Sequence, residues 1–200
     1  DFTQQLPFPG SSLIDYERLF YGVRLEYVDR VRAFGLAHRF LVGVDADQQR
    51  DDRGRRSVNA DGQVTGLTAD EDQTATAGGV FVQTDTDLSD TLTLSLGARA
   101  DRVRLDIDDD LLADGDNSGD QDFTESSYSA GLNWRYQPRH GVYATVSNAF
   151  ETPTFTELAN PSGAGGFNPD LEPQKALNRE IGGRGQLGDR LFYELALFRV

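Results

Sequence analysis

Long runs in which apolar and polar residues alternate are the feature that most constrains the fold of this chain. The clearest run is residues 128–136 (YSAGLNWRY), where an aromatic or aliphatic residue stands at every second position. Residues 92–101 (LTLSLGARAD) follow the same rule. Because successive side chains of a β-strand point to opposite faces, this period of two predicts strands with one apolar face and one polar face.

Eight such strands are predicted, joined by connections that alternate between short and long. The strands run to about ten residues or more, whereas strands of soluble proteins average about five or six. Bacterial outer-membrane barrels combine long strands with short periplasmic turns and long extracellular loops. The sequence therefore predicts an all-β fold, an antiparallel transmembrane β-barrel segment. The expected strands are 19–27, 34–45, 75–88, 92–101, 128–136, 142–147, 175–187 and 191–200; the short turns lie near Asp29, Asp90, Arg139 and Asp189, and the long loops at 50–74, 106–123 and 150–173.

Composition argues against several classes of protein. The net charge of −14 argues against a nucleic-acid partner, because phosphate binding needs a basic surface. The chain has no Cys, and no GxSxG or HExxH motif, so no enzymatic nucleophile or metalloprotease site is predicted. No apolar run approaches the ~18 residues of a transmembrane helix. The mean hydropathy of −0.51 is compatible with membrane β-strands, which are apolar on one face only.

Aromatic residues near the expected strand ends favour a membrane barrel, whose interfacial girdles are built from them. Two alternatives stay open. One is a soluble antiparallel sandwich or barrel, for example a calcium-binding β-domain with a structural or binding role. The other is a complete small eight-stranded outer-membrane barrel. The aromatic residues are Tyr27, Trp134, Tyr136 and Phe150.

A proline-rich stretch, residues 148–173, separates the sixth and seventh expected strands, and so long a connection is usually functional. It contains FETPTFTEL at 150–158 and NPDLEP at 168–173. With the shorter motifs GVFVQ (79–83), LGARAD (96–101), REIG (179–182) and LALF (195–198), it resembles the barrel of TonB-dependent outer-membrane receptors. The motif residues of the stretch, which we expect to be structural, are Phe150, Pro153, Glu157, Leu158, Asn168, Pro169, Leu171 and Pro173.

This resemblance implies a protein of the bacterial outer membrane, embedded in its lipid. Such a receptor is a 22-stranded barrel plugged by its own N-terminal domain. It imports a scarce nutrient with energy transmitted by the TonB complex, and it requires no cofactor. Residues 1–200 hold about eight strands, begin without Met and contain nothing like a plug. We therefore expect them to be part of a larger receptor barrel.

The resemblance also bears on the substrate. Haem receptors of the family carry a His between two motifs of this kind, whereas residues 154–167 contain neither His nor Tyr. Because axial haem ligation needs such a donor, a ferric-siderophore complex is expected instead. The arginines among the candidates could alternatively pair with carboxylates of the plug and the barrel. The candidate substrate-binding residues are Arg99, Arg135, Glu151, Thr152, Thr154 and Phe155.

Residues 114–125 (DGDNSGDQDFTE) have the spacing of a 12-residue calcium-binding loop. The flanking strands, and Gln121 at a position that is normally apolar, favour a solvated acidic loop instead. Calcium is thus an optional ligand of this segment. Its oxygen donors would be Asp114, Asp116, Ser118, Asp122 and Glu125.

Four arginines, Arg50, Arg53, Arg55 and Arg56, cluster in the first expected loop. They could contact lipopolysaccharide phosphates, since guanidinium groups bind phosphate in a bidentate manner. The neighbouring acidic residues favour the other interpretation, a solvated loop of mixed charge.

Overall fold

A single antiparallel sheet makes up almost all of the structure. The computed structural model describes residues 2–5, 12–113, 115–158, 168 and 170–200. Within these residues nine strands lie in the order of the sequence, each hydrogen-bonded to its sequence neighbours. The four-residue helix α1 (Phe155–Leu158) lies between β7 and β8, and no helix in the described residues is long and apolar enough to cross a membrane. The strands are β1 (Phe2–Gln5), β2 (Ser12–Ala33), β3 (Leu36–Val58), β4 (Val64–Ser89), β5 (Leu92–Asp109), β6 (Gly119–Gln137), β7 (His140–Glu151), β8 (Gln174–Leu187) and β9 (Leu191–Arg199).

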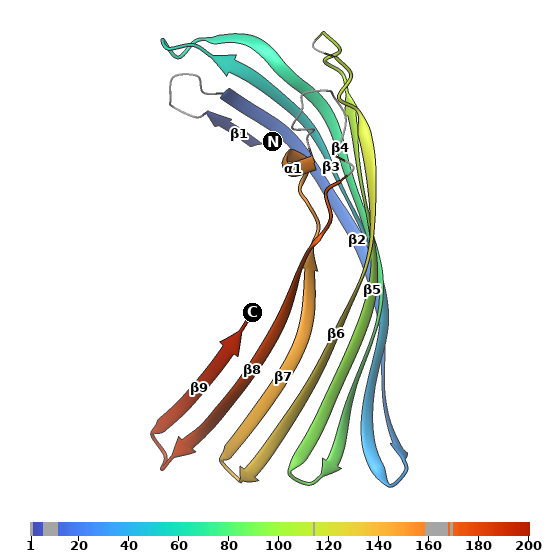
Figure 1. The fold of residues 1–200 in the computed structure, drawn as a ribbon, viewed down its shortest axis with the longest axis vertical. Coiled ribbons are helices and arrows are strands. Elements are labelled where there is room, and N and C mark those ends of the chain that lie inside the picture. Colours follow the sequence, from blue (N-terminus) through green and yellow to red (C-terminus); the bar gives the residue numbers. More distant parts are fainter. Residues whose placement is uncertain (1, 6–11, 114, 159–167, 169) are drawn as a thin grey trace.

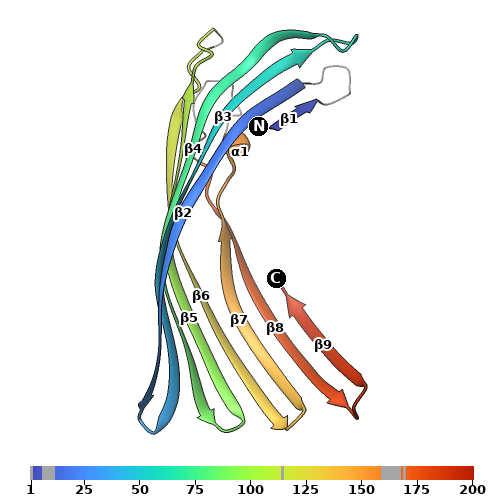
Figure 2. The ribbon, with the colours of Figure 1, turned by 180° about the vertical axis from the view of Figure 1, so that it is seen from behind.

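The sheet is bent into an open trough (Figures 1 and 2). The short turns after β2, β4, β6 and β8 all lie at one end, here called the turn end. The chain leaves β3, β5 and β7 at the opposite end, the loop end, where α1 sits on the concave side of the sheet (Figure 1). The predicted antiparallel fold of eight long strands is confirmed in β2–β9, and β1 is an additional short strand.

The prediction of long loops at 50–74 and 106–123 is wrong, because strands extend into both segments. β3 and β4 stay paired as far as Val58 and Val64, so that only residues 59–63 connect them. β5 reaches Asp109 and β6 begins at Gly119. Beyond the bilayer neither face of a strand must be apolar, so the alternation disappears while the backbone ladder continues. The connection 152–173 between β7 and β8 is long, as expected.

The first turn also differs from its expected position near Asp29. β2 continues to Ala33, and the chain reverses at Phe34 and Gly35, whose φ angles are 52° and 77°. Two successive residues with positive φ are typical of the two-residue hairpin turn of type I′. Phe34, which the alternation places in the second strand, is therefore a turn residue and is fully exposed (100%).

The face opposite α1 carries a continuous apolar band. Leu25 is paired with Val44, and Val44 with Val80, while at the other side of the sheet Ile181 is paired with Leu197. These side chains are exposed, Leu25 by 64% and Leu197 by 74%. A polar environment would not favour an exposed apolar surface of this extent, whereas lipid would.

The buried apolar core lies on the concave face at the loop end. Its centre is formed by Leu105 of β5, Phe123 of β6 and Leu158 of α1, which are 5%, 5% and 0% exposed. One face of a barrel wall contacts lipid and the other contacts the lumen. A core can therefore form only where a connection folds back over the sheet.

Candidate functional site

An arginine bound by two carboxylates lies in the middle of the concave face. Nη1 and Nη2 of Arg99 on β5 each donate to a carboxylate oxygen of Asp45 on β3, both at 2.7 Å. Nε of Arg99 donates to Asp101 at 2.7 Å. The two aspartate side chains are 16% and 12% exposed. Since bidentate pairs are the stronger kind of charge-assisted hydrogen bond, the charge of Arg99 is satisfied within the barrel wall.

The ring of Phe81 lies between two guanidinium groups of this cluster. Cζ of Arg24 is 4.6 Å and Cζ of Arg99 is 5.4 Å from its centroid, within the range of cation–π interaction. Two glycines provide the space. A Cβ on Gly43 would lie 2.3 Å from the Phe81 ring, and one on Gly79 would lie 2.2 Å from Arg99. The wall is therefore recessed here to accommodate a flat polar–aromatic cluster.

The connection between β7 and β8 folds onto the concave wall above this cluster. Leu158 is fully buried, and Phe155 and Leu171 pack against the apolar core that it centres. The amide of Asn168 donates to the Leu158 carbonyl at 2.7 Å, which closes the connection behind α1. The apolar face of α1 thus holds the connection inside the rim of the lumen (Figure 1).

A capping box begins α1. The backbone N–H and the hydroxyl of Thr154 donate to Oε2 of Glu157 at 2.8 and 2.9 Å. In return the Glu157 amide lies 3.4 Å from the Thr154 hydroxyl oxygen, its acceptor. This reciprocal pairing satisfies backbone donors that a helix start leaves free. The backbone N–H of Thr154, and then its hydroxyl, hold the pKa of Glu157 below its usual value.

The strands β6 and β7 separate at the level of the connection. Their pairing ends at Ser129 and Ser147. Beyond it the side chain of Asn148 replaces the ladder, accepting from the Tyr128 amide at 2.6 Å and donating to the Ser126 carbonyl at 2.9 Å. The separation lets β7 lead the chain toward the lumen instead of continuing along β6.

Other motif residues of the connection have roles in the same arrangement. Pro153 is buried where β7 ends, and Phe150 lies opposite Lys175 in the ladder between β7 and β8. The Asn168 side chain accepts from the Asp170 amide at 3.1 Å. Pro173 directly precedes β8, which begins at Gln174. Pro169 and the SGAGG segment, residues 162–166, lie outside the described residues.

The structure brings only some of the candidate substrate-binding residues together. Glu151, the last residue of β7, is exposed at the start of the inward connection, followed by Thr152, Thr154 and Phe155. Arg99 lies further down the wall.

Arg135 is remote from this group. It lies eight residues along β6 from the partner of Arg99, about 26 Å at ~3.3 Å per residue. Contact with a ligand stays a prediction for all six residues.

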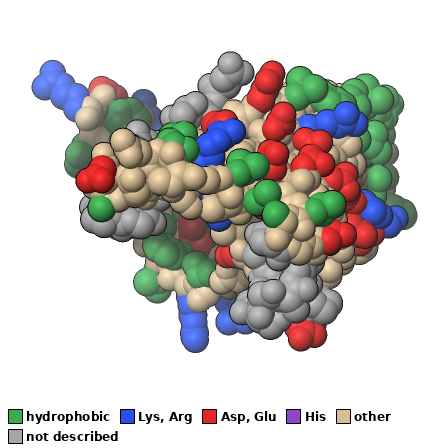
Figure 3. Space-filling view, turned by 90° about the horizontal axis from the view of Figure 1, so that it is seen from above, with side chains coloured by type: hydrophobic (Ala, Val, Ile, Leu, Met, Phe, Trp, Pro, Cys, Tyr) green, Lys and Arg blue, Asp and Glu red, His purple; other side chains and the backbone are tan. Residues whose placement is uncertain are grey.

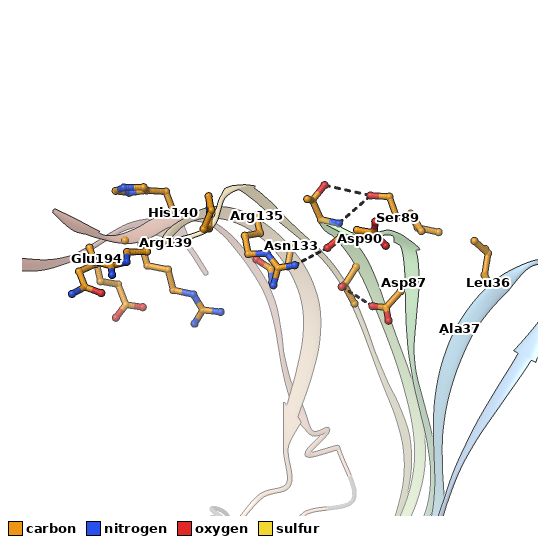
Figure 4. A pocket seen from close by; sticks show the side chains of 18 of the residues that line it. Leu36, Ala37, Asp87, Ser89, Asp90, Asn133, Arg135, Arg139, His140 and Glu194 are labelled. Carbon is orange, nitrogen blue, oxygen red and sulfur yellow. Dashed lines mark hydrogen bonds between the residues drawn. The ribbon is translucent and has the colours of Figure 1, made fainter. Parts of the chain in front are cut away.

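Arg135 belongs to the turn end, where the concave face forms an open hollow of about 1390 Å³. Figure 4 shows its side chain directed to the turn between β4 and β5, where Nη2 donates to the Asp90 carbonyl at 2.6 Å. Arg139 and Glu194 also line the hollow. Two of its polar groups are held by turns of the barrel itself, Arg135 in this way and Arg139 by donating to the Gly188 carbonyl at 3.1 Å.

The acidic segment 114–125 is not one continuous loop, because β6 begins at Gly119. Asp122 is paired with Arg102 at 3.2 Å, and Glu125 with Lys175 at 2.8 Å. Asp114 lies outside the described residues, among which no group of three acidic or histidine side chains could hold a metal. Calcium binding to Asp116, Ser118 and their neighbours stays a prediction.

The strand extensions give one flank of the rim a high density of acidic side chains (Figure 3). Asp72 lies opposite both Asp52 and Asp108 in the ladder, and the Asp110 amide donates to the Asp70 carbonyl beside them. The Asp72 side chain is exposed, and its pKa is raised by desolvation and then by the four neighbouring carboxylates. This flank of the rim is therefore unfavourable for an anion.

The arginines of the first expected loop lie on β3, and three of the four have partners in the chain. The exception is Arg55, whose buried Nε has no hydrogen-bond partner among the described residues. Arg53 is paired with Glu71 at 3.7 Å and Arg56 with Asp15 at 2.7 Å. Nε of Arg50 donates to Gln48 at 3.0 Å. These contacts favour the interpretation of a mixed-charge surface.

Sequence reasoning missed the partners of Arg99 and the ring of Phe81. A glycine inside a strand marks a bulge or a close approach, and Gly43 and Gly79 are such glycines. Their partners are Phe81 and Asp45 only in the register that the sheet adopts. The glycines could therefore have indicated a recess, but not its occupants.

Comparisons with known proteins agree on one family. The sequence matches the family TonB dependent receptor-like, beta-barrel, over residues 2–200. The Vitamin B12 transporter BtuB of Vibrio vulnificus (strain CMCP6) is 34% identical over 94 residues, 46% of this chain and 13% of that protein.

Solved structures share the fold. The ferric citrate transporter FecA, at 17% identity, superposes with a TM-score of 0.83 over 98% of this chain and 29% of its own. The siderophore receptor PiuA from Acinetobacter baumannii, at 18% identity, gives 0.74 over 94% and 32%. The chain thus spans less than a third of each of these relatives.

Proposed function

Because this chain belongs to the TonB dependent receptor-like β-barrel family, we propose that it is part of the wall of a receptor for TonB-energised uptake of a ferric siderophore. Proteins of this family are β-barrels of the bacterial outer membrane, and they are receptors and transporters, not enzymes. The partners of the complete protein would be its plug domain inside the barrel, the TonB complex acting through the plug, and the lipid around the apolar band.

The observation that carries this proposal is the inward fold of the connection between β7 and β8. Leu158 is buried against the concave wall, so Glu151, Thr152 and Thr154 lie at the mouth of the lumen. A ligand captured there would next meet the polar wall around Arg99. Because Asp45 and Asp101 already satisfy that guanidinium, it would present an ordered polar surface and not a free positive charge.

Two substrates compete in this proposal. Residues 154–167 offer no His or Tyr for haem, and the structural relatives include a ferric citrate transporter and a siderophore receptor. The sequence relative is a vitamin B12 transporter, which makes cobalamin the second candidate. The ferric siderophore is preferred because the structural likeness extends over 94–98% of the chain, whereas the sequence likeness covers 46%.

Uptake by the complete receptor tests the proposal. A strain that lacks the receptor gene should fail to grow on at least one ferric siderophore as its iron source, and the restored gene should restore growth. Cobalamin-dependent growth should be unaffected. The reverse pattern would favour cobalamin, and normal growth in both assays would refute both substrates.

A loop variant tests the site. Deletion of residues 154–167 should abolish siderophore uptake while the barrel still assembles and resists unfolding in cold detergent. Replacement of Asn59 by Ala, in the connection between β3 and β4, is the matched control and should leave uptake unchanged. Uptake that survives the deletion would remove the connection from the mechanism. Calorimetry of the complete receptor with millimolar calcium would separately test the segment 114–125.

A further inference from the structure

Two arginines of β8 and β9 face outward and have no side-chain partner among the described residues. Arg179 of β8 and Arg199 of β9 are directly opposite each other in the ladder. Both are exposed. Neither makes an ion pair or a hydrogen bond with any of the described residues, whereas Arg99, Arg53 and Arg56 are all paired.

Their position makes two free charges unusual. The neighbours of this pair on the same face are Ile181, opposite Leu197, and Val146, which lies opposite Arg179 itself. These apolar side chains are 59%, 74% and 40% exposed and belong to the apolar band. Like charges directly opposite each other destabilise a sheet, and a lipid-facing arginine is most unfavourable at the bilayer midplane and much less so near the interface.

Along the bilayer normal, Arg179 and Arg199 lie nearer to the loop end than to the turn end. Arg179 is eight residues from Leu187, where β8 ends at the turn end. For a strand tilted by ~45° this is a height of about 19 Å in an apolar band ~25 Å tall. A long arginine side chain can extend its guanidinium further toward the headgroups. Both guanidiniums can therefore reach the headgroups of the leaflet on the loop side.

We propose that Arg179 and Arg199 together bind a phosphate of a lipopolysaccharide headgroup in the outer leaflet. Guanidinium groups match phosphate oxygens in a bidentate geometry, and two of them at adjacent strand positions would share one phosphate. The bound anion would neutralise the repulsion within the pair. This site differs from the arginine cluster on β3, where Arg53 and Arg56 are ion-paired within the chain.

The test uses the complete receptor in an uncharged detergent, titrated with lipopolysaccharide and followed by native mass spectrometry. The double variant R179Q/R199Q should bind at least about tenfold more weakly, because each charged hydrogen-bonded contact contributes about 1.5–3 kcal/mol. R179K/R199K, which keeps the charge but not the bidentate fork, should fall between. R190Q, in the turn between β8 and β9 at the other side of the bilayer, is the matched control and should bind like the wild type.

Lipid A without phosphates should bind to the wild type as weakly as intact lipopolysaccharide binds to the double variant. Heat-modifiable migration in gels confirms that each variant is folded. Equal binding by the folded double variant would overturn the proposal. Equal binding of phosphatidylglycerol and lipopolysaccharide to the wild type would overturn its assignment to lipopolysaccharide.

Discussion

The burial of Leu158 gives the most quantitative prediction. This side chain is 0% exposed and packs on Leu105 and Phe123, which belong to the wall. Leu158→Ala would leave a cavity between the connection and the sheet, and substitutions of this kind cost about 2–5 kcal/mol. α1 contributes no backbone bond to the strand ladder. The loss should therefore appear as local opening of the connection and not as unfolding of the barrel.

A free-energy loss near the middle of this range can be converted into an expected change in amide exchange rate. At about 3 kcal/mol, the open form of the connection becomes roughly 150-fold more populated, since ~1.4 kcal/mol corresponds to a factor of ten. Amide exchange of protected groups follows the open population. The suitable reporters are the amides of Leu158 and Asn168, which donate to the Thr154 and Leu158 carbonyls at 3.0 and 2.7 Å.

Hydrogen exchange of the complete receptor in detergent measures this effect. Both reporters should exchange on the order of a hundredfold faster in Leu158→Ala, while amides in the middle of β5 and β6 stay unchanged. Leu112→Ala is the matched control, because Leu112 is a leucine of the neighbouring connection that is 64% exposed. Less than about tenfold acceleration, or an equal effect in the control, would refute the idea that Leu158 anchors the connection.

Three further predictions concern the wall and the cap. In Gly43→Ala the new Cβ would lie 2.3 Å from Cζ of the Phe81 ring, which should lower barrel stability by about 1–3 kcal/mol. The temperature at which gel migration changes on heating measures this loss. Gly66→Ala is the control and should leave that temperature unchanged, because a Cβ on Gly66 would have nothing within 4 Å. Asn148→Ala should accelerate hydrogen exchange of the Tyr128 amide, which donates to the Asn148 side chain, about fivefold, because it removes a hydrogen bond that contributes ~1 kcal/mol. Glu157→Gln should loosen α1 at neutral pH but not in acid.

The pH dependence of the last prediction follows from the depressed pKa of Glu157. An acid with a lowered pKa in the folded state stabilises that state above its usual value of 4.5, and the contribution is lost as the pH falls through the lowered pKa. The difference between Glu157→Gln and the wild type should therefore vanish well below pH 4.5. A difference that persists there would contradict the charged cap. For Gly43 the contradicting result is an unchanged melting temperature, and for Asn148 an unchanged exchange rate.

The sequence by itself determined the class of the fold, the number of long strands and the face of most residues. These follow from a period of two, which is a local property of each strand. It also located the rim connection, because proline and glycine interrupt the period there. It failed where the strands leave the bilayer: Arg50 and Asp72 lie in paired strands, because a ladder needs no apolar face in water.

Only the tertiary structure decided which residues meet. Arg99 and Asp45 are 54 positions apart, and Arg179 and Arg199 become neighbours only in one register of β8 and β9. A shift of one residue would move every side chain to the other face. The inward fold of α1 likewise depends on Leu105 and Phe123, which two other strands supply. Register and loop docking arise from contacts between distant segments, so no local pattern could contain them.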